Sequence, residues 1–518
     1  MIPSKLFFGT LCLSFPLLFS GCTEQNLNVS KSVDVPTHKA ISGQRDQILE
    51  REPSLLVGLH PYLGRKTKGL QLAQELRLKS AGGPLILKDE SGLVHKSREI
   101  TIAWRDVPLP TPKTFGRQVV GPFASFESAQ RLALRLRNEG FSALIAHPDN
   151  WEVWVPLGRS LPQGIDFLRW HQAITSEVQP VLKGVSGEIL LTGPVKIEAG
   201  DGLQLKDGVF WGPFWLKADA YGSWTLVEQV PLERYLLGVV PYEIGSSAPS
   251  AALAAQAVLA RTWALANKHR FAIDGYHLCS DTQCQVYKDP SKASPRVKDA
   301  IAKTAGKYLR WQNKPIHAVY HATNGGVMAS ASEAWSMAPV PYLRAELDGS
   351  NQWLDRFVLP LDQSSALRSL LRQSDGAYGN KHPRFRWTRI FQAEDLRKRL
   401  DPFLDANVLP SRVKVLERGT SGRVLSLEIF SEENQLRKVL ELDGIRRILR
   451  ELPSTLFVVN ELRKGVWQFS GGGFGHGVGL SQSGAIDLAR KGWKASQILK
   501  HYYPGTTYGT LQHLPKAP

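Results

Sequence analysis

Residues 232–268 have the sequence LERYLLGVVPYEIGSSAPSAALAAQAVLARTWALANK. The second half predicts one long helix. Pro249 suits a first helical turn after a cap at Ser247 or Ala248, and the Ala, Leu, Gln and Arg residues that follow favour helix. Apolar residues recur on one face of that helix, namely Leu253, Ala257, Ala260, Ala264 and Leu265. We therefore expect a buried helix at the centre of the fold.

Glu243 lies just ahead of this helix and shortly after the apolar run 236–240. A carboxyl in apolar surroundings has a raised pKa, because burial disfavours its charged form. A general acid needs such a pKa. Arg261 follows eighteen residues later and could orient the acid or bind an anionic sugar. The alternative for Glu243 is a stabilising interaction with the positive end of the helix.

A second motif, YHLCSDTQCQVY, covers residues 276–287. Its His277, Cys279 and Cys284 could supply three ligands to a tetrahedral Zn²⁺. A short disulfide loop is the first alternative, and it suits a protein outside the cytoplasm. Two free thiols are the second.

Two glycine-rich motifs follow. Residues 320–326, YHATNGG, end a predicted strand in a glycine turn. In the second motif, residues 470–492, six glycines within positions 471–479 leave His476 on an exposed loop before a helix that starts near Leu480. No GK[ST] follows, and no βαβ unit with a downstream acidic residue is evident. We therefore reject a P-loop and a dinucleotide site.

The composition is that of a globular protein, with 518 residues, 42% hydrophobic and 21% charged. This length predicts about three domains. The net charge of +17 favours an anionic partner such as nucleic acid, acidic lipid or an acidic cell-wall polymer. No basic run is interleaved with aromatic residues and no zinc-finger spacing is present, so we expect no nucleic-acid partner.

The first twenty-two residues predict an export signal, with Lys5 before the apolar run 6–20. Phe19-Ser20-Gly21-Cys22 resembles a bacterial lipobox, which implies a lipid on Cys22; plain cleavage is the alternative. The run is too short for a membrane span. Residues 23–53 are polar and predict a flexible tether. We expect a periplasmic or cell-envelope protein that is anchored to a membrane through lipid.

Residues 117–158 predict a strand, a helix and two more strands. GPF at 121–123 precedes a helix over 127–139. This helix has apolar residues on one face and basic residues elsewhere, and Gly140 ends it. This pattern resembles the SPOR (sporulation-related repeat) domain, whose members bind peptidoglycan glycan strands stripped of their stem peptides. A βαββ unit without wall affinity is the alternative. The segment PLPTP at 108–112 predicts a stiff linker.

Four motifs that occur in one order identify a protein family more specifically than any one of them does. VVPYEI…ALAAQAVLARTWAL, CSDTQCQVY, ATNGG…EAW and GGGFGHGVGLSQSGA…ILKHYYPGT together resemble the SpoIID/LytB family of stage II sporulation protein D and amidase-enhancer proteins. The predicted fold class is α+β, a SpoIID-type mixed domain preceded by a small SPOR-like α+β sandwich domain. The predicted divisions are a signal (1–22), a tether (23–53), an α+β region (54–158), a connector (159–183), the SpoIID/LytB domain (184–510) and a tail (511–518).

This resemblance implies a lytic transglycosylase that cleaves the bond between N-acetylmuramic acid (MurNAc) and N-acetylglucosamine (GlcNAc) and leaves a 1,6-anhydroMurNAc end. Glu243 maps to the family's acid, and no cofactor is required. We assign Arg261, Tyr320, Asn324, His476 and Gln482 to substrate binding. Gln283 replaces the His that often precedes the second Cys, which weakens the case for zinc. The alternative function is a non-catalytic, wall-binding activator of an N-acetylmuramoyl-L-alanine amidase.

Overall fold

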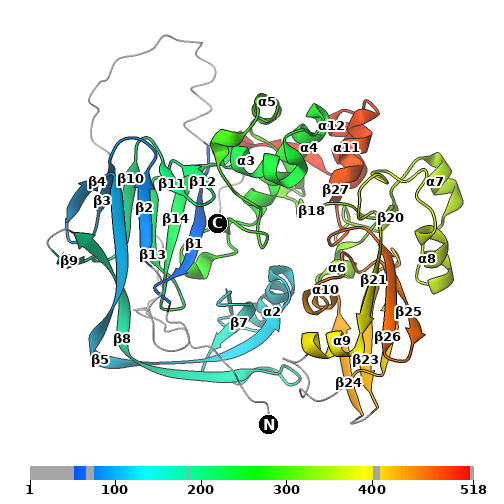
Figure 1. The fold of residues 1–518 in the computed structure, drawn as a ribbon, viewed down its shortest axis with the longest axis horizontal. Coiled ribbons are helices and arrows are strands. Elements are labelled where there is room, and N and C mark those ends of the chain that lie inside the picture. Colours follow the sequence, from blue (N-terminus) through cyan, green and yellow to red (C-terminus); the bar gives the residue numbers. More distant parts are fainter. Residues whose placement is uncertain (1–51, 66–74, 185–186, 401–408, 433–434, 514–518) are drawn as a thin grey trace.

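The computed structural model describes residues 52–65, 75–184, 187–400, 409–432 and 435–513. Two β-sheets occupy one side of the molecule, a group of helices lies beside them, and a further α+β part lies on the other side (Figure 1). The helix α2 (Phe126–Asn138) and the strand β7 (Trp151–Pro156) lie between these parts (Figure 1). Helices and strands occur together throughout, so the predicted α+β class is confirmed.

The first sheet combines strands from distant parts of the chain in the order β15-β1-β14-β13-β10-β3-β4. Their bounds are Leu278–Cys279, Ser54–Leu63, Trp224–Pro231, Phe214–Ala218, Val195–Ala199, Leu85–Lys88 and Val94–Ser97. The strand β1 runs antiparallel to β14 along its whole length. Residues 54–107 therefore do not form a unit separate from the SpoIID-type domain, which corrects the predicted boundary at residue 184.

The second sheet has the order β12-β11-β2-β5-β7-β6, and β8 also pairs with β5 and β9. The bounds of the remaining strands are Gly208–Phe210 (β12), Leu203–Leu205 (β11), Leu76–Ser80 (β2), Glu99–Phe123 (β5), Leu144–Ala146 (β6), Leu168–Gly184 (β8) and Gly187–Leu190 (β9). The predicted order of strand, helix, strand and strand over residues 117–158 is confirmed by β5, α2, β6 and β7.

Two predicted connections are wrong. Residues 108–112 belong to the long strand β5, and the connector 159–183 contains most of β8, its partner. The register of the two strands shifts between Pro108 and Lys113. A proline cannot donate to a ladder, but it is tolerated where a bulge interrupts the pairing. Pro110 and Pro112 of the β5–β8 ribbon therefore lie within the shift.

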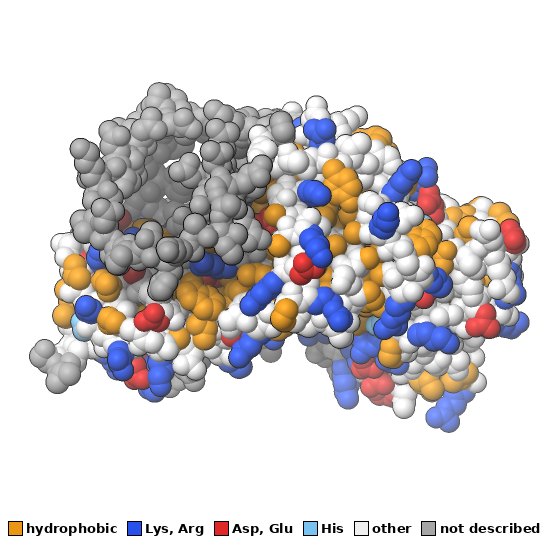
Figure 2. All heavy atoms as spheres, turned by 90° about the horizontal axis from the view of Figure 1, so that it is seen from above, with side chains coloured by type: hydrophobic (Ala, Val, Ile, Leu, Met, Phe, Trp, Pro, Cys, Tyr) orange, Lys and Arg blue, Asp and Glu red, His pale blue; other side chains and the backbone are white. Residues whose placement is uncertain are grey.

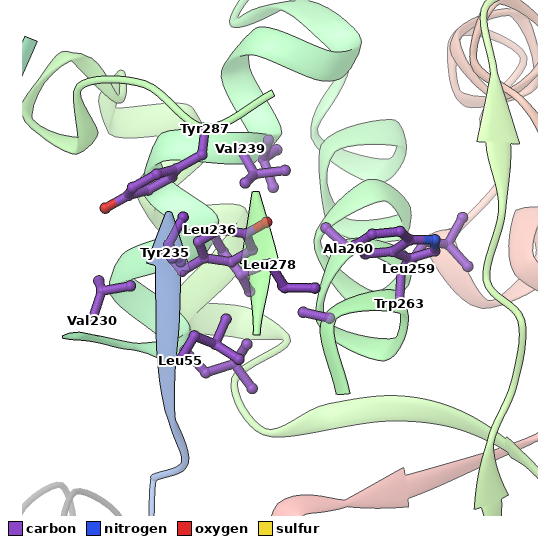
Figure 3. Close-up of a cluster of buried hydrophobic side chains, with 14 of the residues drawn as sticks. Leu55, Val230, Tyr235, Leu236, Val239, Leu259, Ala260, Trp263, Leu278 and Tyr287 are labelled. Carbon is purple, nitrogen blue, oxygen red and sulfur yellow. The ribbon is translucent and has the colours of Figure 1, made fainter. Parts of the chain in front are cut away.

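The predicted central helix is confirmed as α4 (Ser250–Ala266), which follows α3 (Leu232–Val240) and a π-helical turn at Pro241–Gly245. Twelve of the seventeen residues of α4 are buried. Figure 3 shows the core that it shares with β1 and α3, including Leu55, Leu236 and Ala260. The helices α5 (Pro295–Lys303), α11 (Gln482–Arg490) and α12 (Ala495–Tyr502) pack against α4.

The remaining part has its own apolar core and two three-stranded sheets, β21-β26-β25 and β22-β23-β24. Their bounds are Arg386–Gln392, Val466–Gly472, Phe457–Arg463, Arg412–Arg418, Val424–Ser431 and Leu436–Glu441. Its helices are α7 (Asn351–Arg356), α8 (Ser364–Leu371), α9 (Ala393–Leu400) and α10 (Asp443–Ile448). We call residues 351–472 the inserted part, because the chain returns from it to α11 beside α4.

Short elements connect these parts: β16 (Lys307–Trp311), β17 (Lys314–Pro315), β18 (Tyr320–His321), β19 (Val327–Met328), α6 (Ala331–Ala334), β20 (Glu346–Leu347), β27 (Leu480–Ser481) and β28 (Thr507–Thr510). The parallel pair β18 and β27 joins the two glycine-rich motifs. Lys and Arg side chains are spread among hydrophobic ones over the face in Figure 2. The positive charge on this face is therefore not confined to one element.

The predicted signal, Cys22 and most of the tether lie outside the described residues. Within the described ranges, no helix is both long and apolar enough to span a bilayer.

Candidate active site

Glu243 lies in the wall of an open cavity of about 450 Å³ that residues of the α2 segment, the helical group and the inserted part line. Trp263 of α4, the loop 282–286 and Tyr320 of β18 contribute to the same wall. The start of α2 and the helix α10 line the opposite side of the cavity. The cavity thus joins all four predicted motifs to segments that sequence analysis did not connect with them.

The Glu243 carboxyl is held in place by three groups. Its Oε1 accepts a hydrogen bond from the Val286 backbone N–H at 2.8 Å. Burial raises the pKa of Glu243 above its ordinary value of 4.5, while hydrogen bonds from Val286, Tyr320 and Gln482 act in the opposite direction. The π-helical turn that carries Glu243 is a rare conformation that often occurs at functional sites. The predicted raised pKa is therefore confirmed, and the carboxyl can act as an acid.

The loop that provides Val286 is closed by a disulfide between Cys279 and Cys284. Gln285, the residue after Cys284, accepts a hydrogen bond from Tyr235 at 3.2 Å and donates one to Tyr320 at 3.0 Å. This network connects the loop to α3 and to β18. The disulfide loop thus fixes the donors that face Glu243.

The disulfide corrects the predicted metal site. The predicted site needs Cys279 and Cys284 as thiolate ligands, and two sulfur atoms bonded to each other are not thiolates. His277 instead accepts a hydrogen bond from the Leu56 backbone N–H through Nδ1 at 3.0 Å, and burial lowers its pKa to about 4. Over the described residues, no group of three His, Cys, Asp or Glu side chains is arranged to hold a metal ion. His277, Cys279 and Cys284 therefore do not fit zinc.

His476 lines the cavity beside Tyr320. Its Nε2 lies 2.9 Å from the Tyr320 carbonyl, and its Nδ1 accepts from the Val478 N–H at 3.1 Å. Burial lowers the pKa of His476 to about 3, so the ring is neutral and donates from Nε2. The Trp335 ring lies 4.8 Å away, centroid to centroid. His476 is half-buried rather than exposed, and it holds the strand that carries Tyr320.

Two family models match parts of this chain. Residues 220–311 match the model described as Stage II sporulation protein, and residues 329–479 match a domain of unknown function, DUF8618. The chain is 29% identical to stage II sporulation protein D of Bacillus subtilis (strain 168) over 300 residues, which cover 54% of this chain and 75% of that protein. It is 30% identical to the amidase enhancer of the same organism over 298 residues, 52% of this chain and 40% of the relative.

The chain belongs to the SpoIID/LytB family. A protein of Brachyspira hyodysenteriae is also similar, at 26% identity over 319 residues, 60% of this chain and 75% of that protein. The SpoIID match contains Glu243, the helix α4 and the disulfide loop. The second match covers α10 and His476. Residues of both matched segments therefore line the cavity.

In this SpoIID/LytB member, Arg261 is not a cavity residue. Its guanidinium is fully buried and donates two hydrogen bonds of 2.6 Å to Glu233. A third bond of 2.9 Å goes to the Lys307 carbonyl. These contacts connect α4 to the start of α3 and to β16. The predicted contact of Arg261 with substrate or with Glu243 is therefore wrong, because a fully buried side chain cannot reach a ligand.

Asn324 is also structural. It is fully buried, donates to Asp348 at 2.6 Å and accepts from the Gly326 N–H at 2.9 Å. It therefore stabilises the glycine turn, and its predicted contact with substrate is wrong. Tyr320 and Gln482 form hydrogen bonds with Glu243. Substrate binding by Tyr320, Gln482 and His476 stays a prediction.

The residues that sequence analysis missed come from α2 and α10. Glu127 in the first turn of α2 forms a buried ion pair with Arg270, which follows α4. Arg447 of α10 donates to the Phe123 carbonyl at 2.8 Å, across 324 positions of sequence. The SPOR-like segment is thus part of the cavity wall, where the start of α2 lies beside α10 (Figure 1). No local pattern could reveal contacts of such range.

Proposed function

We propose that this protein is a peptidoglycan lytic transglycosylase that cleaves the MurNAc–GlcNAc bond of glycan strands. The observation that carries the proposal is the position of Glu243, a carboxyl with a burial-raised pKa on the wall of a large cavity. The relatives, a stage II sporulation protein and an amidase enhancer, support a cell-wall-related function. The mechanism requires no cofactor.

One carboxyl is enough for this reaction. The protonated Glu243 donates its proton to the glycosidic oxygen as the bond from that oxygen to C1 of MurNAc breaks. The 6-hydroxyl oxygen of the same MurNAc bonds to C1, and its proton passes to the Glu243 carboxylate. The Val286 N–H stabilises this carboxylate between the two transfers. The products are a 1,6-anhydroMurNAc end and a free GlcNAc 4-hydroxyl, and the acid is regenerated without water.

A hydrolase would differ by using a second carboxyl to activate water or to attack the sugar. Glu127 and Asp443 line the same cavity. Glu127 is paired with Arg270. Burial raises the pKa of Asp443 to about 6, so Asp443 is the carboxyl to test. If Glu243 works alone, Asp443→Asn leaves the anhydro product unchanged.

The SPOR-like segment 117–158 is proposed to bind glycan next to the bond that is cut. Ala124, Ser125 and Phe126 line the cavity itself, which supports a direct role over that of a distant tether. Export through residues 1–22 and a lipid anchor at Cys22 remain part of the proposal, and would hold the protein at a membrane in the cell envelope.

The test is mass spectrometry of peptide-free glycan strands incubated with the purified protein. A fragment that starts at residue 184 is unsuitable, because it would lose β1 from the central sheet. We expect products that end in 1,6-anhydroMurNAc from the wild type and from Asp443→Asn, and none from Glu243→Gln. Circular dichroism and thermal unfolding establish that each variant is folded. Reducing-end products would instead identify a hydrolase.

The second candidate function is activation of a wall amidase, which the 30% identity to an amidase enhancer favours. Here the purified protein releases no sugar product but accelerates an added N-acetylmuramoyl-L-alanine amidase. Glu243→Gln would retain that effect, whereas changes in residues 117–158 would reduce it.

A further inference from the structure

Three arginines line the cavity that holds Glu243, and one of them lacks a partner. Arg270 is paired with Glu127, and Arg447 donates to the Phe123 carbonyl. Arg446 makes no hydrogen bond or ion pair with any residue in the described ranges, and its buried Nε has no acceptor. Arg446 and Arg447 both come from α10 of the inserted part.

An unpartnered guanidinium in such a position is unfavourable. Burial lowers the pKa of Arg446, and the nearby Asp443 offsets this only in part. Asp443 itself receives a hydrogen bond from Ser125. Arg446 is half-buried, and its Nε is inaccessible to water. Such a cation without a hydrogen-bond partner gains more from an incoming anion than a fully exposed one does, because less water has to be displaced. The cavity wall is therefore prepared for an anionic group of the ligand.

The inference rests on the proposed function, because it takes the ligand to be a glycan strand. The anionic group on such a strand is the lactyl carboxylate of MurNAc. It is free where no stem peptide is attached and becomes a neutral amide where one is. A planar guanidinium pairs with a carboxylate through two parallel hydrogen bonds, which an amide cannot reproduce.

We propose that Arg446, assisted by Arg447, binds the free lactyl carboxylate of MurNAc in the cavity. In this role Arg446 is a specificity-determining residue that the inserted part contributes to the site. It favours glycan without stem peptides through charge, while the SPOR-like segment forms the neighbouring wall. The reaction at Glu243 is unchanged by this assignment.

The experiment compares two ligands, a GlcNAc–MurNAc oligosaccharide with free lactyl carboxylates and the same oligosaccharide converted to lactyl carboxamides. Calorimetry measures their binding to the full chain carrying Glu243→Gln, so that no ligand is consumed. We expect the acid to bind about tenfold or more tightly than the amide, as a charged hydrogen bond in a desolvated site allows. Adding Arg446→Gln should remove this difference by weakening only the acid.

Arg446→Lys keeps the charge and should restore part of the preference. Arg450→Gln is the matched control, because Arg450 is exposed just beyond α10 and should leave the preference intact. Equal binding of acid and amide to the parent protein would overturn the inference, and this comparison needs no variant of α10. Equal weakening of both ligands by Arg446→Gln would also overturn it. Selective acid binding without any glycan cleavage would contradict the proposed reaction while supporting the anion site.

Discussion

Replacing Arg261 by Met should destabilise the fold without removing any group from the cavity. Its guanidinium is fully buried and donates two hydrogen bonds of 2.6 Å to Glu233. Removing one member of a buried ion pair costs about 3–5 kcal/mol, because the other charge is left without a partner. The Glu233 side chain is 24% exposed and retains some water. We therefore expect a loss near the lower end, about 3 kcal/mol in the free energy of unfolding.

The assay is urea unfolding of the wild type, Arg261→Met, Glu233→Gln and the double variant, followed by circular dichroism. The double variant should lose less stability than the sum of the two single losses, since both remove the same pair. Glycan binding by the folded Arg261→Met protein should equal that of the wild type. An Arg261→Met protein of unchanged stability that no longer binds glycan would refute the structural role and restore the predicted contact with substrate.

Two further predictions concern the disulfide loop and the acid. Replacing Cys279 and Cys284 by Ala should cost about 2 kcal/mol of unfolding free energy, as chain entropy predicts for a six-residue loop, and should lower activity because the Val286 N–H is no longer held against Glu243. A reductant should reproduce both losses in the wild type; a wild type that is insensitive to reduction would contradict this account. Glu243→Gln should gain stability relative to the wild type as pH rises. The raised pKa means that protonated Glu243 stabilises the fold below its ordinary pKa of 4.5, and that this contribution is lost as pH rises through the folded-state value. Urea midpoints measured in acid and at mildly alkaline pH test this, and a difference between the two proteins that does not change with pH would contradict it.

Local patterns in the sequence are sufficient for several features of this protein. The spacing of apolar residues predicts α4, and the order of strand and helix signals predicts the segment 117–158. The position of Glu243 between an apolar run and a helix predicts its raised pKa. These predictions succeed because helix periodicity, turn preference and nearby burial act over a few residues. The order of four motifs was enough to indicate the SpoIID/LytB family, which the comparisons confirm.

Packing between distant segments decides the rest. Arg261 lies on the same helix as the cavity residue Trp263, yet its guanidinium is paired with Glu233 in the interior, and spacing alone does not give the direction of a side chain. The pairing of β1 with β14 joins residues that no local pattern connects. Arg446 enters the cavity because the inserted part folds back toward α2. Strand partners and cavity walls depend on which surfaces can exclude water together, and that choice is made by the whole chain rather than by any one stretch of it.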